Sequence, residues 1–266
     1  MGRCVVIGMA VVGLATAAKP AAAGDGVYEI NQACAVAGCF PNDSPGFPVN
    51  GTVVGGSYKL TSDLVVPDAN TWAVSIPLAA TLDLNGFAIR GPVTCTGVPA
   101  VCTGTGTGGG VGVGASGTVR NGTIRGMGDK GISGDDGVRV ENVQVESNGG
   151  DGIKGYYGSE GWHISDCSIQ RNGGDGIDLN GGAPKGTLIV HNSIYGNTGY
   201  GVQGTGMSML GNMFDSNGSY GFNANMGSGQ ATFGQNTFFN NNGGNANTQK
   251  LGGQSLGGNY CGTSAC

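Results

Sequence analysis

The sequence has 266 residues, of which 57 are glycine, about three times the usual proportion of ~7%. Only 11% of the residues are charged, and 12 lysines and arginines against 17 aspartates and glutamates give a formal net charge of −5. Such a chain cannot assemble the basic surface that phosphate contacts require, so nucleic-acid binding is excluded. Glycine does not recur at every third position, so collagen is excluded as well.

Residues 1–23 are predicted to be a signal peptide. Arg3 precedes an apolar run from Cys4 to Ala15, and small residues lead to a cleavage site after Ala23. The apolar run is too short to cross ~30 Å of hydrocarbon, and no later segment reaches ~18 uninterrupted apolar residues. We therefore expect an exported protein, periplasmic or extracellular, without a membrane span.

Residues 24–50 are predicted to form an N-terminal cap. Apolar residues between positions 25 and 38 are spaced as in a short amphipathic helix, which would cover the first turn of the following structure. Short strands are then expected at 57–60, 64–66, 73–76, 81–84 and 87–89. Residues 95–117 are rich in glycine and threonine and are predicted to be a flexible loop.

Six cysteines form three close pairs along the sequence. They are Cys34 with Cys39, Cys95 with Cys102, and Cys261 with Cys266. Local disulfides are expected in an oxidising compartment. A zinc site is the weaker alternative, because no pair has the C-x-x-C spacing and no histidine lies near a pair. Of the two other cysteines, Cys4 lies in the predicted signal peptide, and Cys167 is predicted to be a buried small residue rather than a nucleophile.

An internal repeat with steps of 20 to 26 residues runs through the second half of the chain. Its first marker is an amide or carboxylate side chain, with an earlier copy at Asn85, and it recurs at Asn121, Asn142, Asp166, Asn192, Asn212, Asn236 and Asn259. The second marker is a three-residue pattern in which glycine and then an apolar residue follow a variable first residue. That first residue is Lys130, Asp151, Asp175, Tyr200 or Tyr220. Two markers that share one irregular period indicate a solenoid.

The predicted fold is all-β: a right-handed, single-stranded parallel β-helix over residues 51–266 with a short N-terminal capping helix. Coils of this length would stack at ~4.8 Å, with the marker asparagines at left-handed corners and their amides hydrogen-bonded from coil to coil. Sharp corners with positive φ would also explain the glycine content. The handedness follows from the general rule for parallel crossover connections.

Several segments resemble secreted bacterial right-handed β-helix repeat proteins of the pectate-lyase-like superfold. They are residues 66–70, 82–89, 119–126 and 148–153. The resemblance implies the same scaffold over the mature chain. That superfold includes polysaccharide lyases, glycoside hydrolases, epimerases and adhesins, so the activity has to be argued from a site.

Alignment of the predicted coils gives a candidate site. Three positions after the second marker the coils carry Ser133, Lys154, Asp178, Gln203 and Asn223. Stacking should therefore bring Asp151, Asp175 and Asp178 together, with Lys154 beside them. In the functional interpretation the three carboxylates hold calcium, which bridges to a uronate chain, and Lys154 removes the proton α to the carboxyl. The following loop would place three aromatic side chains against the sugar: Tyr156, Tyr157 and Trp162.

The alternative interpretation is structural: Lys130 with Asp151 and Lys154 with Asp178 would be ion pairs between neighbouring coils, each contributing ~0.2 to 1 kcal/mol. Residues 172–179 resemble the calcium motif of family 9 pectate lyases. However, Gly174 stands where that motif has an aspartate, and Gln203 stands where the family has its catalytic lysine.

Polygalacturonase motifs are absent, since Asp135–Asp136 is an isolated pair. The sequence thus predicts a secreted, non-catalytic β-helix that acts as a structural or carbohydrate-contacting surface protein. Its alternative is a calcium-dependent polyuronate lyase.

Overall fold

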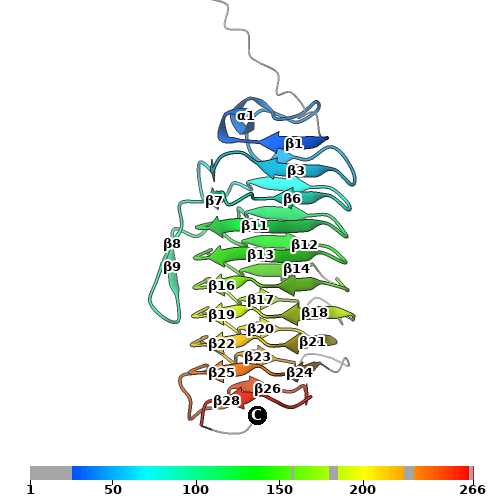
Figure 1. Ribbon diagram of the computed structural model, residues 1–266. Coiled ribbons are helices and arrows are strands. Elements are labelled where there is room, and N and C mark those ends of the chain that lie inside the picture. Colours follow the sequence, from blue (N-terminus) through cyan, green and yellow to red (C-terminus); the bar gives the residue numbers. More distant parts are fainter. Residues whose placement is uncertain (1–25, 157–158, 180–184, 225–230, 264–265) are drawn as a thin grey trace, which may run out of the picture.

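The computed structural model of the protein describes residues 26–156, 159–179, 185–224, 231–263 and 266. Figure 1 shows a single elongated stack of coils, with the capped N-terminal end and the C-terminal end at opposite poles. In the described part of the chain, the coil strands pair in parallel and form a seventeen-stranded and a nine-stranded sheet. The predicted parallel β-helix is confirmed. Residues 1–23, the predicted signal peptide, lie outside the described residues.

The nine-stranded sheet receives one strand from each coil. Its strands are β2 (Val49–Asn50), β5 (Val74–Ile76), β10 (Val111–Val113), β12 (Ile132–Gly134), β14 (Ile153–Gly155), β17 (Ile177–Asp178), β20 (Val202–Gln203), β23 (Phe222–Asn223) and β26 (Lys250–Leu251). Corresponding residues are aligned from strand to strand, as Ile132, Ile153 and Ile177 illustrate.

The seventeen-stranded sheet forms the rest of the coil wall. Its strands up to β15 are β1 (Val27–Ile30), β3 (Ser57–Leu60), β4 (Leu64–Val65), β6 (Thr81–Asp83), β7 (Ala88–Arg90), β11 (Thr118–Arg125), β13 (Arg139–Glu146) and β15 (His163–Ser165). The others are β16 (Ser168–Gln170), β18 (Thr187–Val190), β19 (Ser193–Tyr195), β21 (Met207–Leu210), β22 (Met213–Asp215), β24 (Thr232–Gly234), β25 (Thr237–Phe239), β27 (Gln254–Ser255) and β28 (Tyr260–Cys261).

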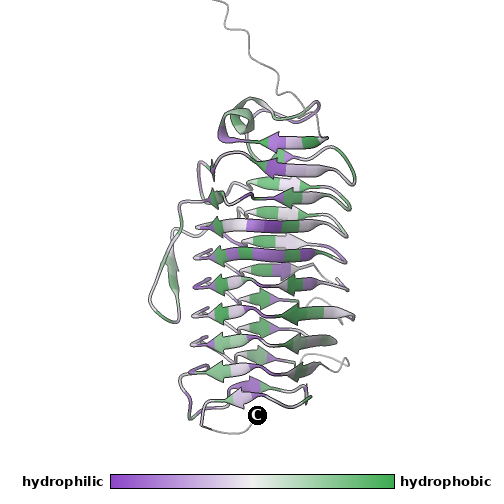
Figure 2. Ribbon diagram, viewed as in Figure 1, coloured by the Kyte–Doolittle hydropathy of each residue, from purple (hydrophilic) through white to green (hydrophobic). Residues whose placement is uncertain are grey.

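The core is a continuous file of aliphatic and aromatic side chains inside the coils. Hydrophobic and hydrophilic residues alternate along many strands, as Figure 2 shows, because successive side chains of a strand point to opposite faces. Toward the C-terminal end the inward residues become aromatic, and the rings of Phe214 and Phe238 stack with centroids 4.6 Å apart. Burial of these side chains stabilises the stack by about 1.5–3 kcal/mol each.

The N-terminal cap contains less helix than the sequence suggested. Helix α1 spans Gln32–Ala37, and the side chain of Asn31 accepts a hydrogen bond from the Cys34 amide at its N-terminus. Val27–Ile30, at the start of the segment predicted to be helical, instead pair as strand β1 with β3 and so begin the first coil. The Cys34–Cys39 disulfide ties the helix to the following turn.

An asparagine ladder forms at one corner, but its register differs from the prediction. Asn121, Asn142 and Asp166 have positive φ and are followed in the same file by His191 and Gly211. Asn192 stands one position later, in line with Cys167, and points inward. Its amide donates to Asn212, which donates to Asn236, at 3.0 Å each. The residues of the first marker therefore form two neighbouring rows along the stack, called files here. The outer file contains Asn121, Asn142 and Asp166, and the inner file contains Asn192, Asn212 and Asn236.

A second internal ladder, which the repeat analysis did not identify, lies at the next corner. Its members are Asn148, Asn172, Asn197, Asn217 and Asn241. Each side-chain amide donates to the side-chain oxygen of the next member at 2.8 to 3.0 Å, and each member is almost completely buried. The ladder satisfies backbone amides that the corner would otherwise leave buried without partners.

The excursion after β7 is a hairpin, not a flexible loop. Strands β8 (Thr94–Thr96) and β9 (Val101–Thr103) pair antiparallel and are joined by the Cys95–Cys102 disulfide. Residues 111–113, also within the predicted loop, form coil strand β10 because Val111 and Val113 are inward-facing core residues. In Figure 1 the hairpin lies along the flank of the stack.

All three predicted disulfides are present, and Cys167 is buried and free, as expected. Burial raises the pKa of the Cys167 thiol to about 12, which makes it a poor nucleophile. Among the described residues, no helix has the length and apolar character needed to cross a bilayer.

Candidate functional site

The outward face of the nine-stranded sheet carries the two predicted columns in the predicted register. In one column Gly112, Ser133, Lys154, Asp178, Gln203 and Asn223 follow one another on adjacent strands. Asp151 and Asp175 lie at the preceding corner, each two residues before its strand. Stacking therefore places side chains 24 residues apart in the sequence on neighbouring coils.

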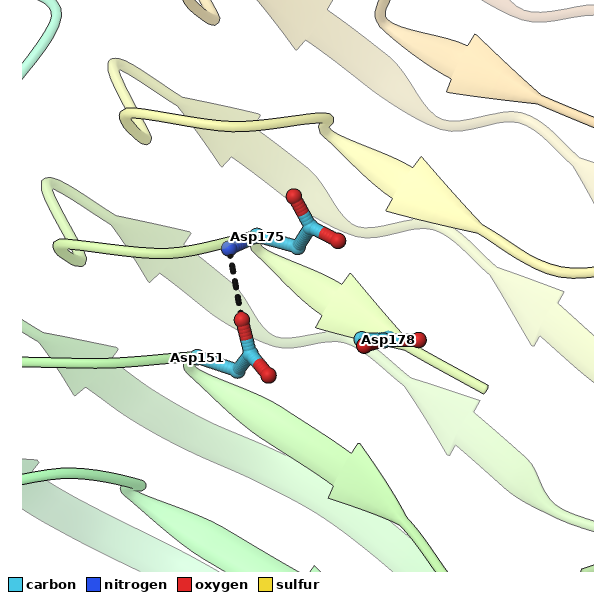
Figure 3. Close-up of side chains that lie close together, drawn as sticks. All are labelled: Asp151, Asp175 and Asp178. Atoms are coloured by element: carbon cyan, nitrogen blue, oxygen red, sulfur yellow. Dashed lines mark hydrogen bonds between the residues drawn. The ribbon is translucent and has the colours of Figure 1, made fainter. Parts of the chain in front are cut away.

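Three carboxylates converge on this face. Asp151, Asp175 and Asp178 each offer one oxygen such that the three oxygens lie within 4.8 Å of one another. Figure 3 shows Asp151 and Asp175 on successive coils, with a dashed line from the Asp175 amide to the Asp151 carboxylate, and Asp178 beside them. Asp178 is 8% exposed. Such a cluster offers oxygen ligands of the kind that calcium prefers.

Two of the carboxylates also satisfy the backbone of the next coil. The Asp175 amide donates to Asp151 Oδ1 at 2.8 Å, and the Tyr200 amide donates to Asp175 Oδ1 at 2.7 Å. A Cβ atom at Gly174 would lie 2.3 Å from Asp151 Oδ1. Backbone atoms of Gly150 and Asp151 would lie 3.0 and 2.9 Å from the same Cβ atom, so the coil before it requires glycine at position 174, where the calcium motif has an aspartate.

Lys154 contacts two of the three carboxylates, those of Asp151 and Asp178. Its Nζ forms an ion pair and a short hydrogen bond with Asp178 Oδ2 and lies 3.5 Å from Asp151 Oδ2. Burial of the amine lowers its pKa, but the hydrogen bond and charge of Asp178 and the charge of Asp151 outweigh this effect. The pKa of Lys154 therefore lies above its ordinary value, and the side chain is an ammonium ion at neutral pH.

Burial and the mutual repulsion of the three carboxylates favour protonation of the cluster. Burial, followed by the charges of Asp151 and Asp178, raises the pKa of Asp175 to about 7, although the Tyr200 amide lowers it. The pKa of Asp151 is also raised, chiefly by burial. Three carboxylates against one ammonium group leave an excess of negative charge that a proton or a cation can neutralise.

The three aromatic side chains predicted to contact sugar have different environments. Tyr156 is 47% exposed, and its hydroxyl lies 3.1 Å from Ser133 Oγ on the site face. Tyr157 lies outside the described residues. Trp162 is completely buried, so the prediction that it stacks on a sugar ring is wrong. Trp162 already belongs to the next coil, where it stands in line with the buried residues Thr187 and Met207.

Other aromatic side chains flank the cluster and were missed in the sequence. The ring of Trp72 lies against Gly109, where a Cβ atom would come within 2.5 Å of it, and 3.9 Å from the Cβ position of Gly112. On the other side of the cluster the rings of Tyr200 and Tyr220 stack at 6.2 Å with an interplanar angle of 13°. The available signal was the glycine run 108–110, which leaves room for a large ring from the preceding coil.

Solved structures with a similar fold include two polysaccharide epimerases. A variant of the periplasmic alginate epimerase AlgG matches 79% of this chain at 12% identity with a TM-score of 0.51, and the match covers 60% of the AlgG chain. The A-module of mannuronan C-5 epimerase AlgE4 from Azotobacter vinelandii matches 88% of this chain and 76% of its own at 16% identity, with a TM-score of 0.42. At such identities the likeness shows the fold alone.

No curated protein matches the sequence significantly. The family model described as "Right handed beta helix region" matches residues 109–252, which is more than half of the sequence. This match confirms the predicted handedness and includes the carboxylate cluster, Lys154 and the tyrosine pair. The chain belongs to the right-handed β-helix family.

Proposed function

We propose that this chain is a non-catalytic, carbohydrate-binding β-helix protein whose ligand is a polysaccharide bound along the outward face of the nine-stranded sheet. The observation that carries the proposal is the line of aromatic side chains on both sides of a polar cluster. Trp72 lies on one side, and the stacked Tyr200 and Tyr220 lie on the other. Aromatic faces between hydrogen-bonding groups suit sugar rings, which have apolar faces and polar edges.

The chemistry of Lys154 supports binding rather than catalysis. A base that removes a proton α to a carboxyl group must be a neutral amine. Lys154 is paired with two carboxylates, and its pKa is raised. As an ammonium ion it instead donates hydrogen bonds and offers a positive charge to a sugar hydroxyl or a uronate.

A calcium-dependent polyuronate lyase remains the second candidate, and the convergence of Asp151, Asp175 and Asp178 within 4.8 Å favours it. These residues fit calcium in part, since the cluster is oxygen-rich but two of its oxygens already accept backbone amides. A bound calcium ion would supply positive charge for a substrate carboxylate. Lys154 would then be the proton acceptor, which requires release from its ion pair with Asp178.

Export belongs to the same proposal. Three disulfides are typical of an oxidising compartment, and the described residues contain no membrane-spanning helix. The AlgG structure is that of a periplasmic alginate epimerase, which suggests an acidic polysaccharide as the first ligand to test. We propose that residues 1–23 direct the protein across the membrane.

Isothermal titration of the protein with alginate, polygalacturonate and a neutral glucan tests the proposal. We expect at least one polysaccharide to bind, and Trp72→Ala to weaken that binding by about tenfold, since one stacked ring contributes ~1.4 kcal/mol or more. Tyr260→Ala is the matched control, because Tyr260 is an exposed aromatic residue of the other sheet. Equal effects of the two variants would contradict the proposed binding face.

Incubation with the same polyuronates and calcium distinguishes the two candidates. The proposal predicts no gain in the ultraviolet absorbance of an unsaturated uronate product. Absorbance that grows with time and disappears in Lys154→Ala would establish the lyase instead.

A further inference from the structure

A pocket separate from the carboxylate cluster lies where the hairpin leaves the coil wall. It has a volume of about 320 Å³ and is bounded by the ends of strands β7, β11 and β13 and by the first residues of the hairpin. None of its lining residues belongs to the carboxylate cluster. A space of this size accommodates a monosaccharide, near the lower limit for small-molecule sites.

Two arginines stand side by side in this pocket. Arg90 of β7 and Arg125 of β11 are direct partners in the parallel strand register, and both line the pocket. Like charges at paired positions of a sheet repel each other. In a sequence with only 12 lysines and arginines, this pairing concentrates positive charge at one point of the surface.

The protein satisfies these two guanidinium groups incompletely. Arg90 Nη2 lies 2.7 Å from Asp63 Oδ2, but Arg90 Nε is buried and has no hydrogen-bond partner among the described residues. Arg125 Nη1 lies 3.9 Å from Glu146 Oε1, too far for a hydrogen bond. Both arginine side chains nevertheless stay nearly half exposed, at 43% and 44%, so a ligand in the pocket can reach them.

The other polar groups of the pocket can hydrogen-bond to the hydroxyls of an acidic sugar. Thr94 and Ser147 contribute hydroxyl groups. Glu146 also lines the pocket, and its Oε2 accepts hydrogen bonds from Gln144 at 2.9 Å and Gln170 at 3.0 Å, which leaves its negative charge partly compensated. Guanidinium groups bind oxyanions through two parallel hydrogen bonds, and hydroxyls and a carboxylate bind sugar hydroxyls.

We infer that this pocket binds the oxyanion group of an acidic saccharide, either a carboxylate or a sulfate ester, between Arg90 and Arg125. The ring of the saccharide would lie toward Thr94 and Ser147. This site is independent of the proposed polysaccharide face, since it uses the other sheet and the base of the hairpin.

Titration calorimetry at constant ionic strength tests this inference with three probes: glucuronate, glucose 6-sulfate and glucose. We expect one or both charged sugars to bind and glucose to give no heat above dilution. The comparison of glucuronate with glucose 6-sulfate identifies which oxyanion the pocket prefers. Arg125→Gln should weaken the binding by about tenfold or more, because it removes a charged donor.

Arg139→Gln is the matched control, since Arg139 is an exposed arginine of β13 that lies beside His163 outside the pocket. It should change the affinity by less than about twofold. Arg125→Lys keeps the charge but loses the paired donors, and should bind with intermediate affinity. The melting temperature of each free variant shows whether it is folded.

Absence of binding by both charged sugars would overturn the inference. Equal binding of glucose, full affinity in folded Arg125→Gln, or equal losses in the Arg125 and Arg139 variants would overturn it too.

Discussion

Gly174 illustrates how one missing side chain shapes the carboxylate cluster. The Asp151 carboxylate can accept the Asp175 amide because nothing projects from position 174, where a Cβ atom would lie 2.3 Å from Asp151 Oδ1. At Gly112, in strand β10, the atoms nearest to a Cβ atom would lie 3.9 Å or more away. The two glycines therefore form a matched pair, of which one is required and one is replaceable.

We predict that Gly174→Ala lowers the free energy of unfolding by about 1–3 kcal/mol through the clash and the weakened carboxylate hydrogen bond. Gly112→Ala should change it by less than about 0.5 kcal/mol. Urea unfolding followed by circular dichroism measures both values. Similar losses at the two positions would contradict the predicted clash between a Cβ atom at position 174 and Asp151.

Asp175 makes the stability of the protein depend on pH. Its pKa is raised to about 7 in the folded protein, whereas the ordinary value is 3.8. Between these values the folded state holds more protons than the unfolded state, so the free energy of unfolding falls as the pH rises toward 7, and the loss is complete above it. The direction is opposite to that of an aspartate stabilised by a salt bridge.

Asp175→Asn removes this titration and keeps an oxygen that can accept the Tyr200 amide. We expect the variant to melt a few degrees higher than the parent protein at pH 8, and close to it at pH 4.5. Asp166→Asn is the control, because it removes a well-exposed carboxylate from another corner. A difference between variant and parent that is the same at both pH values would contradict the raised pKa.

The two tryptophans show what the sequence could not specify at this scale. Sequence spacing placed Trp162 in a surface loop, but its side-chain direction depends on where the next coil begins, and the coil begins early enough to turn Trp162 into the core. Trp72 precedes β5, and only the contact with Gly109 in the following coil reveals its position on the site face. The carboxylates were predictable because they lie next to glycine markers that fix the register.

At the scale of the element, the corner that carries the asparagines also shows which features the sequence could predict and which it could not. The period and the parallel strands follow from the repeated pattern, and the strands of the early coils appear within one residue of their predicted limits. The one-residue shift of Asn192 was invisible, because Asn serves both roles: it tolerates a left-handed conformation at positions 121 and 142, and it forms the internal ladder at 192. The outer file also has a side-chain hydrogen bond, from Asn142 to Asn121 Oδ1 at 3.1 Å, so burial rather than residue type separates the two files.

We predict that the two files differ in their contribution to stability. Asn212 is buried, accepts from the backbone and side chain of Asn192, and donates to Ile189 O and Asn236, so Asn212→Ala leaves several polar groups without partners. The expected loss is about 3 kcal/mol or more. Asn142→Gly, on the outer file, keeps the left-handed corner and loses only an exposed hydrogen bond to Asn121, so it should cost less than about 1 kcal/mol.

Urea denaturation of both variants measures these losses. Comparable destabilisation by Asn142→Gly would mean that corner conformation, rather than the ladder, holds the coils in register.

At the scale of the whole molecule, the hairpin adds contacts that a solenoid otherwise lacks. In a stack of coils each coil touches only its neighbours, so stability is a sum of nearest-neighbour contributions. The Ala100 amide, just before β9, donates to Gly196 O at 2.9 Å, and the Thr198 hydroxyl donates to Ala100 O, 98 residues away. The hairpin also places both disulfide sulfurs within 3.7 Å of Asn148 O. It therefore braces several coils together.

Removal of the Cys95–Cys102 disulfide should loosen this brace and make unfolding less cooperative. For the double variant Cys95→Ser, Cys102→Ser we expect a loss of about 2 kcal/mol together with a broader urea transition, because coils on either side of the brace can then unfold separately. The double variant Cys34→Ser, Cys39→Ser is the control, since that disulfide closes a loop of similar length within the N-terminal cap. It should lower the midpoint without broadening the transition. If both double variants unfold as sharply as the parent protein, the cooperativity of the stack comes from the coils themselves, and the hairpin contributes only local contacts.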